Sequence, residues 1–321
     1  MGAACPRALS AMLPRVVYGE LQYCQRRIAV ASPPTGQDRQ PAGHTSPHLT
    51  NKERDQADAH STPRALVVHE IIRQEGETAL RRDTLALLWS ALAAGLSMGF
   101  SFLTQAVLET RMSPPASGAF SLVGAAGYCV GFVIVVLGRQ QLFTESTLTV
   151  ILPVLTHRDA RTLLAALRLW IIVLCGNLAG TWIFAGILLL PTPFTARLAP
   201  ALSALAQSSL QPAGFASTTL RAVLAGWLIA LMVWLLPNAR SAAVLIIAVV
   251  TYVVAICELS HVIAGSTEAA YLVLGGGAGF ADYLGRFLAP TLLGNTIGGV
   301  ALVGLLNHAS IAPEMSGRGQ T

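Results

Sequence analysis

The chain carries one pattern twice: an apolar span is broken by a short polar stretch, and a later span contains Gly-Asn followed by a further glycine. The first copy covers the break at 140–146 and the glycines of 176–180, and the second covers 260–266 and 294–298. Backbone that leaves the helical form at membrane depth is tolerated only inside protein or beside a cavity. Two such breaks at corresponding positions therefore predict a solute path between two halves of a channel or transporter.

Composition independently indicates a membrane protein. Hydrophobic residues make up 53% of the chain and charged residues 12%, whereas a soluble domain has about 25% charged residues. The charges gather in residues 1–83, and residues 84–306 are mostly apolar. Arginines that flank membrane spans account for the net charge of +5 better than nucleic-acid binding does, so we expect a lipid bilayer and no nucleic acid as partner.

The order of these segments predicts four parts. Residues 1–62 are polar and rich in Pro, Ser, Gln and Gly, which is typical of a disordered leader. Residues 63–83 predict an amphipathic helix on the cytoplasmic surface, whose apolar face would contain Leu66, Val67, Ile71 and Ile72. Residues 84–308 would form the transmembrane transport domain, and residues 309–321 a cytoplasmic tail.

Six apolar segments are long enough to cross a bilayer of about 30 Å hydrocarbon thickness. They are 85–108, 117–137 with a continuation at 147–155, 169–190, 216–237, 241–256 with a continuation at 268–274, and 283–306. The arginine bias predicts both termini in the cytoplasm, with these arginines inside: Arg73, Arg81, Arg82, Arg158, Arg161, Arg168, Arg240 and Arg318.

Each set of three spans has its break in the middle member, and three spans reverse the direction of the chain across the membrane. The two halves are therefore predicted to form a 3+3 inverted repeat in an all-α membrane protein, with spans two and five broken. Counted from Phe143 and from His261, the next Gly-Asn pair begins 33 residues later in both copies. We expect the two breaks to face each other across a pore.

His261 is the first candidate pore residue. It lies in the second break beside Ser260 and Gly265, where a side chain can face a cavity. Ionisable groups inside a membrane are costly and usually mark a pathway, whereas a lone histidine on an apolar face is more often a satisfied core residue. Here the break favours the pathway, with His261 resting as a neutral hydrogen-bond donor.

The first break offers Leu142 and Phe143 as a hydrophobic constriction and Thr144 as a hydroxyl for a passing solute. Core packing by Leu142 and Phe143 is the alternative. Asn177 and Asn295 could either bond exposed carbonyl groups between closely packed helices or donate to a solute in the pore. Glu145 and Glu258 could cap the broken helices or pair with Arg139.

No motif in the sequence suggests a metal, a cofactor or an enzymatic reaction. The five cysteines have no CxxC spacing, and the seven histidines form no HExxH pair. An intramembrane enzyme would need a nucleophile or a metal cluster at depth, and one histidine without matched acids does not supply it. A water or glycerol pore is disfavoured because the paired Asn-Pro-Ala signature is missing.

Taken in order, these motifs resemble the formate/nitrite transporter family, and within it the YfdC-like branch. The resemblance is carried over residues 63–308 by 69–76, 94–101, Leu142-Phe143-Thr144, the 261–266 segment and the two Gly-Asn spans. It implies an aquaporin-like hourglass protomer, a homopentamer in the cell (inner) membrane, and passage of small monovalent anions such as formate or nitrite. It also implies that Thr144 hydrogen-bonds a central His261.

Some features depart from that family's pattern. Ser260 stands where formate-conducting members often have an acidic residue, and Lys52 is the chain's only lysine. We therefore expect arginines to collect anions on the inner side, with Arg139, Arg158 and Arg240 as candidates. The solute could cross with a proton supplied at His261. A non-conducting membrane scaffold or sensor built on the same fold is the alternative function.

Overall fold

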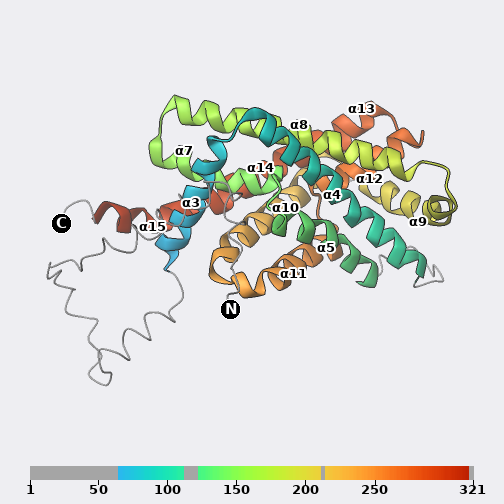
Figure 1. Cartoon of the computed structure of the whole chain (residues 1–321), viewed down its shortest axis with the longest axis horizontal. Coiled ribbons are helices and arrows are strands. Elements are labelled where there is room, and N and C mark those ends of the chain that lie inside the picture. Colours follow the sequence, from blue (N-terminus) through green and yellow to red (C-terminus); the bar gives the residue numbers. More distant parts are fainter. Residues whose placement is uncertain (1–63, 112–121, 211–213, 318–321) are drawn as a thin grey trace, which may run out of the picture. The chain divides into compact units, whose positions relative to one another are not determined.

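A computed structural model describes residues 64–111, 122–210 and 214–317, and every regular element in these ranges is a helix (Figure 1). The leader predicted for residues 1–62 lies outside them. In chain order the elements are α3 (Ala65–Leu80), α4 (Thr84–Arg111), α5 (Leu122–Leu137), α6 (Phe143–Thr149), α7 (Ile151–His157), α8 (Ala160–Leu188), α9 (Pro193–Ser209), α10 (Phe215–Leu235), η1 (Leu236–Asn238), η2 (Arg240–Ala242), α11 (Ala243–Ile256), α12 (Val262–Leu274), α13 (Phe280–Asp282), η3 (Tyr283–Leu288), α14 (Ala289–Ile297), η4 (Gly298–Leu305) and α15 (Leu306–Gly317).

Four of the described helices are long and apolar enough to cross a membrane. They cover Thr84–Arg111, Ala160–Leu188, Phe215–Asn238 and Phe280–Ile311. Large apolar side chains on their outer faces are exposed, among them Trp89, Leu164, Ile171 and Leu220. An exposed apolar surface of this kind suits lipid or a neighbouring subunit rather than water.

The two remaining spans are each built from two helices. With 16 and 14 residues, α5 and α11 are only about 24 and 21 Å long, which is less than the hydrocarbon thickness. Helices α6 and α12 continue them after a break, and α5 packs against α11 (Figure 1). The predicted spans two and five are therefore broken helices, and the all-α architecture with a break in the middle of each half is confirmed.

Both breaks begin with the same backbone turn. Helix α5 ends in left-handed Arg139 (φ 53°), and α11 ends in left-handed Glu258 (φ 50°). The next amide closes the turn in each case: Gln140 N–H donates to the Val135 carbonyl, and Leu259 N–H donates to the Val254 carbonyl. The chain thus stops two helices in the same way, although neither left-handed position is occupied by the glycine that this conformation usually favours.

Glycines bring the long helices together in corresponding pairs. A Cβ atom on Gly95 of α4 would lie 2.1 Å from the backbone oxygen of Asn177, and one on Gly226 of α10 would lie 2.4 Å from that of Asn295. No side chain fits at such a distance. The close contact of α4 with α8 and of α10 with α14 therefore depends on hydrogen atoms at these positions.

Several predicted boundaries are wrong. Helix α8 begins at residue 160 rather than 169, because Asp159 caps it by accepting a hydrogen bond from Thr162 N–H. The helices after the breaks begin at 143 and 262, earlier than the predicted 147 and 268. Helix α9 was not predicted; it has a capping box at Thr192 and Thr195 and packs against α12 and α4.

The amphipathic helix predicted for residues 63–83 is α3, although its buried face differs from the predicted one. Ile72 is fully buried as expected, but Val67 is 47% exposed and His69 is buried instead. His69 Nε2 lies 3.1 Å from Nδ1 of His308 in α15. Burial, followed by the nearby His308, lowers the pKa of His69 to about 4. The α3 helix is thus held against α15 by a neutral histidine pair.

We expect Gly226→Ala to lower the free energy of unfolding by about 1–3 kcal/mol, because the added methyl group would overlap the backbone of Asn295. Thermal unfolding of the purified protein in detergent measures the effect. Gly285→Ala is the matched control, since a Cβ atom at Gly285 would meet nothing within 4 Å. Equal melting temperatures for the two variants would contradict the proposed helix contact.

We also expect the stability of the wild-type protein to fall as the pH is lowered from about 6.5 to about 4. In this range the unfolded chain protonates residue 69 while the folded chain keeps it neutral, so acid favours the unfolded state. His69→Gln retains a polar partner for His308 but does not titrate. Its melting temperature should therefore decrease less over the same range, and an unchanged decrease would show that His69 is not responsible.

Candidate functional site: a pore at the two helix breaks

Asn177 of α8 holds the first break together. Its Oδ1 accepts a hydrogen bond from Phe143 N–H at 2.9 Å, which caps α6. Its Nδ2 donates to the carbonyl oxygens of Ala91 at 2.8 Å and of Gln141 at 2.9 Å. One fully buried amide therefore satisfies two backbone groups of the break, at Gln141 and Phe143, and also ties α8 to the Ala91 carbonyl of α4.

Asn295 of α14 does the same at the second break. Its Oδ1 accepts from Val262 N–H at 2.8 Å, and its Nδ2 donates to the carbonyl oxygens of Ala222 at 2.7 Å and Ser260 at 2.9 Å. Both asparagines are fully buried, and neither lines either of the two cavities described below. The amides bond backbone groups, as the packing interpretation predicted.

These equivalent bonds also correct the register of the repeat. The spacing of 33 residues pairs Phe143 with His261, but the structure pairs Phe143 with Val262 and Leu142 with His261 as the residues that begin the two helices. The first copy has one extra residue between its break and its asparagine.

His261 begins α12 and joins the two breaks. Its Nδ1 accepts a hydrogen bond from Ala264 N–H at 3.2 Å, and its Nε2 lies 2.9 Å from Thr144 Oγ1. Because Nδ1 accepts, the proton of the neutral ring is on Nε2 and is donated to Thr144. The ring is 1% exposed and packs edge-on against Phe132, with ring centroids 5.0 Å apart. We call the Thr144–His261 contact, together with Leu142 two residues before Thr144, the neck.

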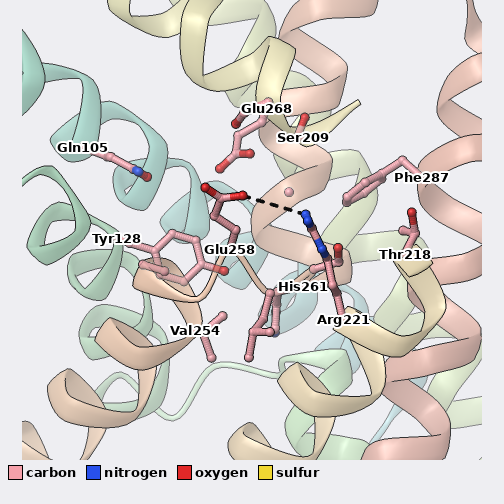
Figure 2. Close-up of a pocket in the computed structure, with 15 residues that line it drawn as sticks. Gln105, Tyr128, Ser209, Thr218, Arg221, Val254, Glu258, His261, Glu268 and Phe287 are labelled. Atoms are coloured by element: carbon pink, nitrogen blue, oxygen red, sulfur yellow. Dashed lines mark ion pairs between the residues drawn. The ribbon is translucent and has the colours of Figure 1, made fainter. Parts of the chain in front are cut away.

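Two cavities approach the neck. The wide cavity has a volume of about 1000 Å³ and is lined by residues of α3, α5, α6 and α10, including Leu142 and Glu145. The narrow cavity has a volume of about 80 Å³ and is lined by His261, Ser260 and residues of α4, α5 and α10 (Figure 2). Arg221 of α10 borders the narrow cavity and Val233 borders the wide one, and these two residues are about 18 Å apart along that helix.

The predicted constriction residues have different positions. Leu142 is 1% exposed and lines the wide cavity at the neck, whereas Phe143 lines neither cavity and packs toward Trp170 with ring centroids 6.4 Å apart. Ser260 lines the narrow cavity. The structure therefore brings Leu142, Thr144, Ser260 and His261 to the space between the cavities, and it places Phe143 in the core.

The structure describes the side chains of two of the three arginines predicted to collect anions, and one of these lines a cavity. Arg139 lines the wide cavity and forms an ion pair with Glu75 at 3.3 Å. Arg158 is exposed at the end of α7 and lines neither cavity, and the side chain of Arg240 lies outside the described part of the chain. The predicted pairing of Glu145 or Glu258 with Arg139 is absent from the described residues.

The narrow cavity contains charged and polar residues that were not predicted as site residues. Arg221 of α10 forms an ion pair with Glu258 at 3.9 Å, and Glu268, Gln105 and Tyr128 lie around this pair (Figure 2). The sequence does contain a signal for these residues: each is a polar side chain within an apolar span, and such side chains are costly in a membrane. Among the described residues, no three His, Cys, Asp or Glu side chains lie together as a metal site.

Comparison with known proteins gives a consistent result. Residues 66–309 match the family described as formate/nitrite transporter. The chain is 39% identical over 255 residues to inner membrane protein YfdC of Escherichia coli strain K12, with 79% of this chain and 81% of that protein covered.

Two solved structures have a similar fold. A pentameric formate channel with formate bound has a TM-score of 0.59 and 22% identity, with 70% of this chain and 95% of that chain covered. An ion channel of the FNT family has a TM-score of 0.61 and 21% identity, with 77% and 96% covered. These likenesses support the hourglass arrangement of the helices.

We expect Asn295→Asp to destabilise the protein by about 2–4 kcal/mol, because the carboxylate still accepts from Val262 N–H but cannot donate to the carbonyl oxygens of Ala222 and Ser260. Thermal unfolding in detergent measures this loss. Thr296→Val is the matched control, because the Thr296 hydroxyl bonds only a carbonyl of its own helix. Equal unfolding of both variants would show that Asn295 is not a structural clamp.

Proposed function

The chain belongs to the formate/nitrite transporter family, and we propose that it conducts small monovalent anions of weak acids, such as formate and nitrite, between the two cavities through the neck. The observation that carries this proposal is the meeting of two broken helices at Thr144 and His261, with a cavity on each side. A packed membrane scaffold has no need of two unwound segments that face each other at depth.

The neck favours a solute that can lose its charge. Leu142 and the ring of Phe132 provide apolar walls, and a bare anion pays a large desolvation cost in such a place, whereas its protonated acid pays much less. Thr144 accepts from His261, so the hydroxyl hydrogen of Thr144 remains available to donate to the solute. The proposed path therefore combines an apolar constriction with one hydrogen-bond donor.

A proton would accompany the anion in this scheme. His261 is the ionisable group at the centre of the neck, and its Nε2–H lies beside the hydroxyl that meets the solute. Its effect would be to favour the neutral acid over the bare anion at the constriction. Weak-acid flux should then depend on pH.

We further propose a homopentamer in the inner membrane with both termini in the cytoplasm. The pentameric formate channel of similar fold supports the assembly, and YfdC, which is described as an inner membrane protein, supports the location. The arginine bias of the sequence supports the orientation. In this placement the wide cavity, which α3 borders, faces the cytoplasm and the narrow cavity faces outward.

The test is flux of formate and nitrite into liposomes that contain the purified protein, at two pH values. The wild type should exceed protein-free liposomes, and Thr144→Val should reduce the flux about tenfold because one hydrogen bond at the neck is lost. His261→Ala should reduce it at least as much, because Thr144 loses the ring that orients its hydroxyl.

Thr156→Val is the matched control, since the Thr156 hydroxyl donates only to Leu152 in the preceding turn of α7. Wild-type flux equal to that of empty liposomes would favour the scaffold or sensor instead. If His261→Ala conducts at the wild-type rate and the flux does not depend on pH, the role of the proton is excluded, although conduction itself is not.

A further inference from the structure

Each cavity contains a carboxyl group and a glutamine carbonyl that lack hydrogen-bond partners. In the narrow cavity they are Glu268 and Gln105; Gln105 is 2% exposed, and its Oε1 receives no hydrogen bond (Figure 2). In the wide cavity they are Glu145 and Gln140, and Oε1 of each is buried without a partner. Buried polar atoms are normally satisfied, so Oε1 of Gln105, Gln140 and Glu145, which are buried without partners, call for an explanation.

Several donors that line the narrow cavity are already engaged. The hydroxyl groups of Ser208, Ser209 and Thr218 each donate to a backbone carbonyl three or four residues earlier. The guanidinium group of Arg221 is paired with Glu258. The carboxyl group of Glu268 makes no hydrogen bond or ion pair with the described residues. Glu268 is therefore not held by any of these donors, which suits a carboxyl group that carries a proton.

His261 is poorly arranged to store that proton. Both of its ring nitrogens are engaged, Nδ1 by Ala264 N–H and Nε2 by Thr144. A second proton on Nδ1 would break the cap of α12. His261 therefore orients Thr144 at the neck, and another group must exchange protons with the solute on each side.

We propose that Glu268 and Glu145 are the proton carriers on the two sides of the neck, an inference that rests on the proposed conduction of weak-acid anions. An ionised carboxyl group that receives no hydrogen bond is costly beside apolar side chains, and taking up a proton removes this cost. Glu145 directly follows Thr144 in the chain, and Glu268 shares the narrow cavity with His261. The two carboxyl groups thus flank the constriction.

The exchange balances as follows. On the narrow side, the O–H bond of protonated Glu268 breaks and its proton passes to the anion, which becomes the neutral acid. The acid crosses between Thr144 and His261, and on the wide side its proton passes to ionised Glu145, which releases the anion. Water on the narrow side returns a proton to Glu268, and Glu145 gives its proton to water on the wide side.

Other charged groups surround each carrier. Glu268 shares its cavity with the Arg221–Glu258 pair and the titratable groups Tyr128 and His261. Around Glu145 the wide cavity is lined by Arg82 and by the Arg139–Glu75 pair.

In each cavity the positive charge of the nearby arginine is balanced by its carboxylate partner: Arg221 is paired with Glu258, and Arg139 with Glu75. Neither carrier has a cation bonded to it among the described residues. Its protonation is therefore free to follow that of the solute.

The experiment measures formate flux together with proton uptake in liposomes, with a pH-sensitive dye inside. At an external pH of 7, Glu268→Gln and Glu145→Gln should each reduce both signals about tenfold or more, because proton transfer by a positioned group contributes at least this much. Lowering the external pH to 5 supplies about a hundredfold more of the protonated acid, so the deficit of Glu268→Gln should shrink. Glu268→Asp should recover part of the flux at pH 7.

Asp282→Asn is the matched control, because Asp282 lines neither cavity and its half-exposed side chain is paired with Arg286 in the next turn. It should retain at least half of the wild-type proton uptake. Equal flux and proton uptake in the wild type and both glutamine variants would overturn this inference alone. A deficit of the same size at both pH values would also overturn it, since a purely structural defect behaves in that way. Wild-type flux no greater than that of empty liposomes would overturn the proposed function and this inference together.

Discussion

The structure depends on satisfying backbone groups where two helices are interrupted in an apolar environment. An unpaired amide or carbonyl group costs several kcal/mol in the hydrocarbon region, so an interruption needs a built-in partner. Asn177 and Asn295 provide it, each with one acceptor and one donor directed at a break and a second donor directed at a neighbouring long helix. The breaks can persist at depth because these two side chains replace the missing helical bonds.

Other features follow from this requirement. The asparagines reach the breaks only because Gly95 and Gly226 let α4 and α10 approach the backbones of α8 and α14. With the helix starts fixed, Thr144 and His261 lie within one hydrogen bond of each other. The pore is thus a consequence of how two separate halves satisfy their own backbones, and the polar contact at the neck joins those halves.

Much of this arrangement could be predicted from the sequence, because its cause is local. The Gly-Asn pairs, the broken apolar spans and the lone His261 are visible as residue types at regular positions, and they gave the inverted repeat and the meeting of the two breaks. The register was wrong by one residue, since spacing alone cannot show that the first copy has one extra residue between its break and its asparagine. Helix α9 was missed because the apolar pattern of its segment is weak and its capping box is a local signal that was not used.

The lining of the cavities was the least predictable part. Gln105, Arg221 and Glu268 come from three different helices, and only tertiary packing brings them around His261 (Figure 2). Arg139 and Glu258 occupy equivalent left-handed positions in the two halves, yet each pairs with a residue from another helix rather than with the other. Charge at a cavity thus depends on which helices meet there, and this information is not contained in the spacing of a single span.

The most direct test of the pore is to fill the neck from the side of the wide cavity. Leu142 is buried at that point, and Leu142→Trp would place an indole group where the solute must pass. If the path lies between the two breaks, formate flux in liposomes will fall to the level of protein-free liposomes while the variant still unfolds cooperatively. Wild-type flux through a folded Leu142→Trp protein would show that the solute crosses elsewhere.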